Sequence, residues 1–370
     1  MNKRITNIDF IRGLAVLGIF VMNSVVHALP FSAYFNPSSA GTSNVFDWIT
    51  VFLSELFVAQ KMMGLFSVLF GASIVLFIES AQKKGKDAKR LSLRRNFLLF
   101  CFGIIHMLFW EGDVLVIYAL CAPIIILTYN KKIKFLFILG LVITLFPILL
   151  SIFFQSAYDP VTGKNTLFAE GEDIGLGKFW FADSDDYGSS ALVFLFGGFC
   201  RALGMMFIGV VLYRKFILNG ILESKIYKKM IFYGFSFGIL STLLSFIWYL
   251  SKDYSPSIAL IGYIPATIGM IPMVIGYIGL FSLLNRCLPE SIGVYFSACG
   301  KMAFTNYITQ TIFGILIFNF IFSKGTLGRA EVMAFVFVVW IIQILWSKYW
   351  LDNYKYGPLE WIWRKLTYIS

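Results

Sequence analysis

Long apolar runs separated by short polar or basic segments extend from one end of the chain to the other. A helix needs about 20 predominantly apolar residues to cross a hydrocarbon core roughly 30 Å thick. About ten runs approach that length, so the pattern predicts an all-α fold, a polytopic integral membrane helix bundle in the cell membrane. The predicted spans are residues 9–29, 61–80, 95–110, 113–130, 134–155, 190–213, 227–250, 258–284, 299–322 and 330–350.

Two apolar stretches do not fit a simple span. Residues 95–129 would extend about 52 Å as one helix at 1.5 Å per residue, which exceeds the bilayer thickness. The flanking basic segments must share a face of the membrane, so we expect a hairpin that turns at residues 111–113 on the outer face. Residues 46–60 carry two acids and a glutamine among apolar positions, which predicts an interfacial or helix-packed segment leading into the second span.

Basic residues set the orientation. Most of the 31 Lys and Arg residues gather in the linkers between spans on one face and in the C-terminal tail, as in 83–95, 131–134 and 214–229. Because cytoplasmic loops carry an excess of Lys and Arg, we expect both termini in the cytoplasm. The net charge of +11 follows from these clusters and does not indicate nucleic acid as a partner.

The remaining composition predicts one domain without a metal. We expect a single transmembrane domain over 1–370, with N-terminal helices in 1–155, an extracytoplasmic acidic loop at 156–189 and C-terminal helices in 190–370. The acids at 183–186 lack the glycine and closing glutamate of a calcium loop. The five cysteines lie in or beside apolar runs without paired spacing, so neither a disulfide nor a permanently bound cofactor is predicted.

Polar residues mark one face of the first span. Asn23 lies almost three helical turns above Arg12, with Asp9 one turn below that arginine and His27 one turn above the asparagine. An intramembrane charge costs a few kcal/mol, so Arg12 is expected to face protein or a cavity, with Asp9 as its nearest partner. The alternative is that both ions lie among the cytoplasmic head groups.

His27 and His106 are the two histidines of the chain, and the predicted topology places both near the outer ends of their spans. Histidine exchanges protons near neutral pH. Asp113, at the predicted turn, could reach back to His106 and fix its tautomer, which is the base-and-orienter pair that acyl transfer commonly needs. The alternative is a buried histidine that bonds to a neighbouring helix.

Further intramembrane polar residues are candidates for a binding site. Asn306 and Gln310 are four residues apart and share a helix face, which suits either interhelical contacts or a ligand. Arg201 lies in mid-span and needs an anionic partner or water. Lys61 and Lys301 complete the set.

Several motifs carry a family resemblance. They are "RITNIDFIRGLAVLGIFVMN" at 4–23, "LFSVLFGA" at 65–72, "GIIHMLFWEGDVLVIYA" at 103–119, "GMMFIG" at 204–209, "GKMAFTNYITQ" at 300–310 and "GPLEWIWR" at 357–364. In this order they resemble the YeiB-like family of bacterial multi-pass membrane proteins, whose C-terminal half is a domain of unknown function. His106 and Asp113 match the YeiB-like motif directly.

A wider similarity links the first span to transmembrane acyltransferases. The pattern of Asp9, Arg12 and Asn23 is similar to the first helix of heparan-alpha-glucosaminide N-acetyltransferase, which moves an acetyl group from cytosolic acetyl-CoA to a lumenal sugar amine through a histidine. It also resembles bacterial enzymes that O-acylate surface polysaccharides, although these carry a histidine where this chain has Asn23. His27, one turn away, could substitute for that histidine.

These residues lead to a functional hypothesis with alternatives. The first reading is an acyltransferase that takes an acyl group from an acyl-CoA-type co-substrate in the cytoplasm to a hydroxyl or amine of an extracytoplasmic small molecule or glycan. His106 would be the general base, Asp113 its orienter and Asn23 a donor to the oxyanion. The candidate substrate-binding residues are Asp9, Arg12, Lys61, Arg201, Lys301 and Asn306.

Two other readings stay open. A transporter or channel for a small anionic solute would use the same cations, and Pro265 and Pro272 give it some support because they interrupt a span. A scaffold protein would pair its polar residues within closed helix contacts. The enzyme reading predicts one cavity that contains His106, Asp113 and Asn23 and connects to the cytoplasm.

Overall fold

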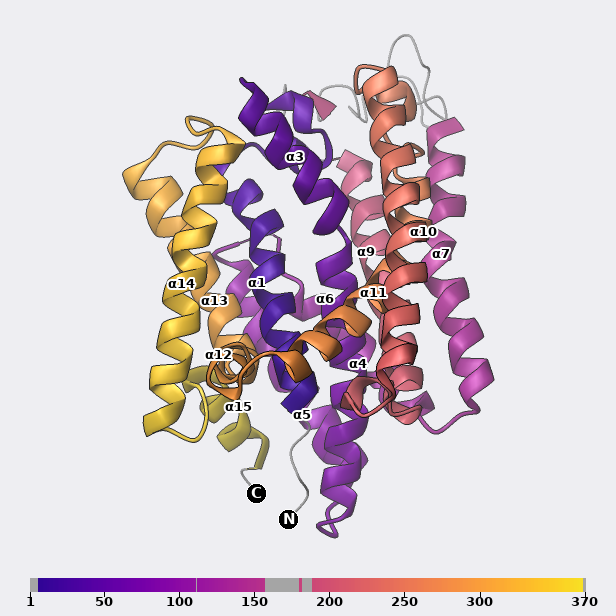
Figure 1. The fold of residues 1–370 in the computed structure, drawn as a ribbon, viewed down its shortest axis with the longest axis vertical. Helices are drawn as coiled ribbons and strands as arrows, with labels where there is room; N and C mark the ends of the chain where they lie inside the picture. Colours follow the sequence, from indigo (N-terminus) through magenta and orange to yellow (C-terminus); the bar gives the residue numbers. More distant parts are fainter. Residues whose placement is uncertain (1–5, 111, 157–179, 182–187, 369–370) are drawn as a thin grey trace.

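A computed structural model describes the chain except for residues 1–5, 111, 157–179, 182–187 and 369–370. The predicted acidic loop at 156–189 lies largely outside the described residues. All regular structure in the described part is helical (Figure 1). Its longer helices are α1 (Thr6–Ala28), α3 (Val45–Phe57), α4 (Lys61–Gln82), α5 (Ala88–Met107), α6 (Leu115–Thr128), α7 (Ile133–Ser156), α9 (Gly188–Arg214), α10 (Ser224–Ser251), α11 (Ile264–Cys287), α12 (Glu290–Lys301), α13 (Ala303–Ile315), α14 (Arg329–Asn353) and α15 (Pro358–Tyr368).

The predicted membrane bundle is confirmed. Among the described residues, 8 helical stretches are long and apolar enough to cross a membrane, and they coincide with eight of the predicted spans. The other two predicted spans form α5 and α6. In Figure 1 the start of α1 and the end of α15 lie at the same end of the bundle, as expected for two cytoplasmic termini. We call this the cytoplasmic end.

α1 lies inside the bundle. It packs against α4, α11, α12, α13 and α14, and 83% of its apolar window is buried. By contrast, 28% of the corresponding window of α10 and of α14 is buried, so those helices face lipid over much of their surface. The polar side chains of α1 are therefore presented to other helices, and not to the bilayer.

The second crossing is a broken helix. α3 and α4 together form a 38-residue crossing, Val45–Gln82, that is interrupted at residues 58–60. Gln60 has a positive φ of 61°, which is uncommon for a residue other than glycine. Residues 46–60 are therefore the outer part of a crossing, packed on α10 and α14, which is the helix-packed form of the prediction.

The α5–α6 hairpin does not reach the outer surface. The 14 residues of α6 span about 21 Å at 1.5 Å per residue, which is less than the hydrocarbon core. Trp110 and Asp113 in the turn are 7% and 6% exposed. The predicted turn on the outer face is therefore wrong for Asp113, which is buried against His106 of α5 and Tyr307 of α13. Leu108 and Phe109 of the same connection are apolar and exposed. Glu111 lies outside the described residues.

α15 closes the cytoplasmic end by capping α13. The Glu360 carboxylate accepts hydrogen bonds from the backbone N–H groups of Phe304 (2.8 Å) and Thr305 (3.0 Å) and from the Thr305 hydroxyl (2.6 Å). These N–H groups belong to the first turn of α13 and have no partner within that helix. Glu360 thus fixes α15 against the start of α13.

We expect Glu360→Ala to lower the stability of the protein by about 1–2 kcal/mol, as for the loss of a helix cap. Burial raises the pKa of Glu360 above its usual range, so the carboxyl group binds its proton more tightly in the folded state than in the unfolded state. The stability of the wild type should therefore fall as the pH rises from the unfolded pKa through the folded one. Thermal unfolding in detergent at several pH values tests this, and Glu360→Gln should lack the pH-dependent loss.

Candidate functional site

A hydrogen-bonded relay lies at the centre of the bundle. The Nδ1 atom of His106 is 2.7 Å from Oδ1 of Asp113, and its Nε2 atom is 3.0 Å from the hydroxyl of Thr311. The Tyr307 hydroxyl donates to the same Asp113 oxygen at 3.3 Å, and the backbone N–H of Val116 donates to the other at 3.0 Å. All four side chains of this histidine relay (His106, Asp113, Tyr307 and Thr311) are buried.

The contacts of the relay suit one tautomer of His106. With the proton on Nδ1, the imidazole donates to the Asp113 carboxylate and its Nε2 atom accepts from the Thr311 hydroxyl. A hydroxyl, an imidazole and a carboxylate in this order form the nucleophile–base–orienter arrangement of acyl-transfer enzymes. The geometry can therefore withdraw a proton from a hydroxyl and stabilise the resulting imidazolium.

Local structure explains why these groups meet. His106 is in the last turn of α5, and Asp113 follows seven residues later in the hairpin turn. Tyr307 and Thr311 are four residues apart on α13 and so face the hairpin together. The expected contact between His106 and Asp113 is present, whereas sequence reasoning missed Thr311 and Tyr307. Their only signal was a polar stripe on the same helix as Gln310.

The Trp110 indole separates the two histidines. Its ring centroid lies 5.0 Å from that of His27 and 5.7 Å from that of His106. Within the described residues, the buried Nε2 of His27 and Nε1 of Trp110 have no hydrogen-bond partner. His27 is therefore a neighbour of the relay through Trp110 and not a member of it.

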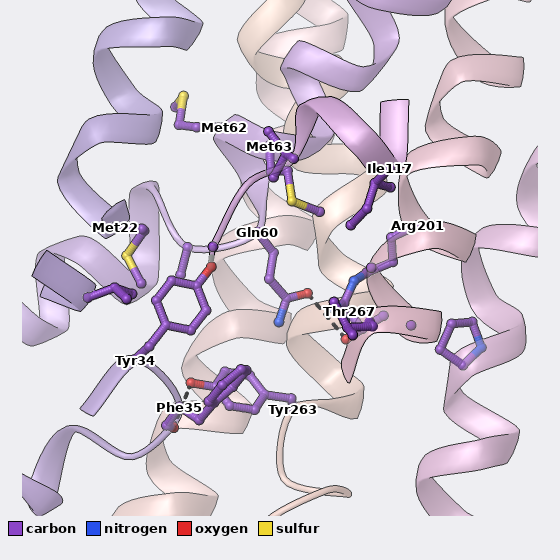
Figure 2. A pocket seen from close by; sticks show the side chains of 18 of the residues that line it. Met22, Tyr34, Phe35, Gln60, Met62, Met63, Ile117, Arg201, Tyr263 and Thr267 are labelled. Atoms are coloured by element: carbon purple, nitrogen blue, oxygen red, sulfur yellow. Dashed lines mark hydrogen bonds between the residues drawn. The ribbon is translucent and has the colours of Figure 1, made fainter. Parts of the chain in front are cut away.

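A cavity of about 360 Å³ has Trp110 in its lining, whereas neither histidine lines it. Its walls come from α1, α2 (Ser32–Phe35), the α3–α4 break, α6, α7, α9 and α11, so the chain segments that meet there are far apart in sequence. In Figure 2, Tyr34 and Arg201 project toward Gln60 from opposite sides. The polar lining residues are Asn23, Tyr34, Glu55, Gln60, Ser151, Arg201, Tyr263 and Thr267.

Hydrogen bonds hold part of this lining in place. The Thr267 hydroxyl donates to the Gln60 side chain at 3.4 Å, and the Tyr263 hydroxyl donates to the Phe35 carbonyl at 3.1 Å. The phenols of Tyr34 and Tyr263 line the cavity, and a phenolic O–H can donate a hydrogen bond to a ligand. Gln60 also carries the unusual backbone conformation of the helix break, and such strain tends to occur at ligand sites.

The structure brings together only some of the predicted site residues. Asn23 and Arg201 line the cavity, whereas His106 and Asp113 do not; the lining residue Trp110 packs against His106. The prediction of one cavity that contains His106, Asp113 and Asn23 is thus wrong in the described structure. The physical reason is that His106 and Asp113 satisfy each other and their partners on α13, so they need no water.

The other candidates lie elsewhere. Arg12 donates to Asp9 at 3.0 Å and to Ser73 at 2.8 Å, which confirms the expected pairing within α1. Lys61 is 1% exposed, and its ammonium donates to the backbone carbonyl of Glu55. Lys301 ends α12 and does not line the cavity.

Asn306 joins helices. Its amide donates to the Cys299 carbonyl at 3.1 Å and to the Ser347 hydroxyl at 3.0 Å, and its oxygen accepts from Trp346 at 2.7 Å. Gln310, one turn later, donates to Gln343 of α14 at 2.9 Å. Of the two roles that the sequence left open for this face, the structure supports interhelical contact.

Comparison with known proteins gives the family. Residues 212–370 match the family model described as "Protein of unknown function (DUF418)". The chain is 30% identical over 383 residues to "Uncharacterized protein YeiB" of Escherichia coli (strain K12), covering 99% of this chain and 97% of that protein. It is 28% identical over 404 residues to "Uncharacterized protein YxaH" of Bacillus subtilis (strain 168), covering 100% and 95%. This multi-pass membrane protein therefore belongs to the DUF418 family of YeiB-like bacterial proteins.

Proposed function

We propose that the protein is a membrane-embedded acyltransferase. The observation that carries this proposal is the buried order of Thr311, His106 and Asp113, in which an oriented imidazole accepts a hydrogen bond from a hydroxyl. A helix-to-helix contact needs only one hydrogen bond from histidine. Here both ring nitrogens of His106 make hydrogen bonds. The Asp113 carboxylate is also bonded to the Tyr307 hydroxyl and the Val116 backbone N–H, and these bonds hold it in position to orient the base.

In the proposed reaction an acceptor hydroxyl or amine in the cavity attacks the carbonyl carbon of an acyl thioester. The His106 Nε2 atom takes the proton of the nucleophile, directly or through the Thr311 hydroxyl, and returns it to the thiolate that leaves when the C–S bond breaks. The Trp110 indole must move aside for the acceptor to reach the relay. The acyl-CoA-type donor approaches from the cytoplasmic end.

Asn23 is the proposed donor to the oxyanion. Its side chain lines the cavity and has no hydrogen-bond partner among the described residues, so its N–H groups are available to a ligand. An amide aimed at the developing negative charge stabilises the transition state more than the ground state. Arg12 and the basic linkers at the cytoplasmic end would attract the phosphates of the donor.

A second candidate function is transport of a small anionic solute. It is favoured by the break between α3 and α4, because discontinuous helices beside a mid-membrane cavity are common in secondary transporters. Gln60 at this break and Arg201 both line the cavity. Transport would move the solute unchanged, whereas acyl transfer forms a new ester or amide bond.

The experiment that separates these functions uses the full chain in proteoliposomes. A donor with an isotopic label in its acyl group is supplied on one side and a mixture of hydroxyl and amine acceptors on the other, and products are identified by mass spectrometry. Labelled ester or amide supports the enzyme. Uptake of an intact labelled anion without any new bond would refute it and support transport.

Asn23→Ala is expected to lower acyl transfer by about 10²- to 10³-fold, the usual loss for one oxyanion donor. Ser151→Ala is the matched control, because Ser151 lines the same cavity from α7 and has no part in the proposed chemistry. The initial rate of labelled product in proteoliposomes measures both. Equal rates for Asn23→Ala and the wild type would remove Asn23 from the mechanism.

A further inference from the structure

Arg201 is a cation without a carboxylate partner in the described structure. It extends from the middle of α9 into the cavity, and its buried Nε atom makes no hydrogen bond within the described residues. Its neighbours include the phenols of Tyr34 and Tyr263, which line the same cavity, and the thiol of Cys200, and none of these is a carboxylate. A guanidinium within a membrane protein normally faces an anion or water, so this side of the cavity is suited to an anionic group.

Glu55 does not supply that anion. Its side chain also lines the cavity, yet two other cations, Lys61 and Arg329, lie within its electrostatic range. Glu55 is thus engaged by Lys61 and Arg329, the second of which also has Asp47 as a neighbour, whereas no carboxylate acts on Arg201 among the described residues. The charged groups around the cavity thus favour a negatively charged ligand.

The rest of the lining is apolar. It includes Ile117, Leu195 and the methionines Met22, Met62 and Met63. The flexible side chains of methionine can adapt to the shape of a bound hydrocarbon chain. Leu195 is 56% exposed, so this wall of the cavity reaches the surface of the protein at α9. The volume of about 360 Å³ suits a ligand with one chain and not a diacyl lipid.

We infer that the cavity binds a single-chain amphiphile whose anionic head group, a phosphate or carboxylate, pairs with Arg201 while its chain occupies the apolar part. The guanidinium fork matches the oxygen geometry of either head group. An amphiphile of this class that also bears a hydroxyl or amine would be the acyl acceptor. That role rests on the proposed function, whereas binding does not.

The test measures equilibrium binding of radiolabelled dodecyl phosphate to the full chain in nanodiscs of zwitterionic lipid. Inorganic phosphate and dodecanol serve as probes of the head group alone and of the chain alone. We expect dodecyl phosphate to bind at least about tenfold more tightly than either. If dodecanol binds with equal affinity, the cavity does not recognise the anionic head group. If inorganic phosphate binds with equal affinity, the cavity does not bind the chain of an amphiphile. Either result would refute the inference.

Variants locate the site. Arg201→Gln should weaken dodecyl phosphate binding at least about tenfold, and Arg201→Lys should weaken it less because the charge remains. Arg214→Gln on the same helix is the matched control, since Arg214 bonds to the carbonyls of Tyr129 and Lys131 away from the cavity. Unchanged binding in folded Arg201→Gln would refute the inference.

A second variant tests the cavity without touching its charge. A Cβ at Gly198 would make an ordinary 3.8 Å contact with Ile117, which lines the cavity, so Gly198→Leu should fill part of the space and weaken dodecyl phosphate binding while leaving the protein folded. Unchanged binding would contradict the assigned site, even if Arg201→Gln did not fold. Binding without acyl transfer would refute only the proposed function, and acyl transfer without dodecyl phosphate binding would refute only this inference.

Discussion

Replacement of His106 by alanine is expected to abolish acyl transfer, with a loss of at least about 10³-fold. The imidazole is the one group of the relay that can both accept and return a proton near neutral pH, and general acid–base catalysis contributes about 10²- to 10⁴-fold. The measurement is the rate of labelled product in proteoliposomes. Full activity in the alanine variant would remove the central residue of the proposed mechanism.

The control for this prediction separates chemistry from folding. His106→Ala leaves the buried Asp113 carboxylate without its closest partner, which destabilises the protein. Asp113→Asn is nearly isosteric and avoids this problem, but it favours the wrong imidazole tautomer. The same change in a Ser-His-Asp triad lowers kcat by about 10⁴-fold. A folded Asp113→Asn protein, as judged by size-exclusion chromatography, should therefore be almost inactive and show an altered pH–rate profile.

The sequence was sufficient for most of the fold because the bilayer imposes strong rules. Apolar runs of membrane length located the eight long spans, and the Lys and Arg clusters placed both termini at one end. The depth of the α5–α6 hairpin was not predictable, since an apolar helix that packs on protein and one that faces lipid have the same composition. The break before Gln60 was also hidden, because neither glycine nor proline marks it.

The site was predictable only where it is local. His106 and Asp113 are seven residues apart, so the turn geometry alone suggests their contact. Thr311 is 205 residues from His106 and enters the relay through the packing of α13 on the hairpin, which no sequence spacing reveals. The cavity likewise combines Asn23 with Arg201, and the intervening Trp110 that separates them from His106 follows from tertiary packing.

Gly300→Ala is expected to have the second largest effect, a loss of folded protein. α1 and α12 cross so closely that a Cβ at Gly300 would overlap the backbone carbonyl of Asp9, and a Cβ at Gly13 would overlap that of Phe296. Backbone atoms cannot rotate away as a side chain does, so the two helices must separate. We expect a destabilisation of about 3 kcal/mol or more, the upper range for overpacking.

The matched control is Gly293→Ala on the same helix, where the nearest atom to a new Cβ is the Asn285 side-chain oxygen at an ordinary 3.7 Å. Both substitutions change the helix propensity of α12 equally, so a difference between them reports the contact with α1. The yield of monodisperse protein and its unfolding temperature in detergent measure the effect. Similar unfolding temperatures for the two variants would show that α12 can move away from α1 at little cost. The Asp9–Arg12 end of α1 would then not depend on this close helix crossing for its position.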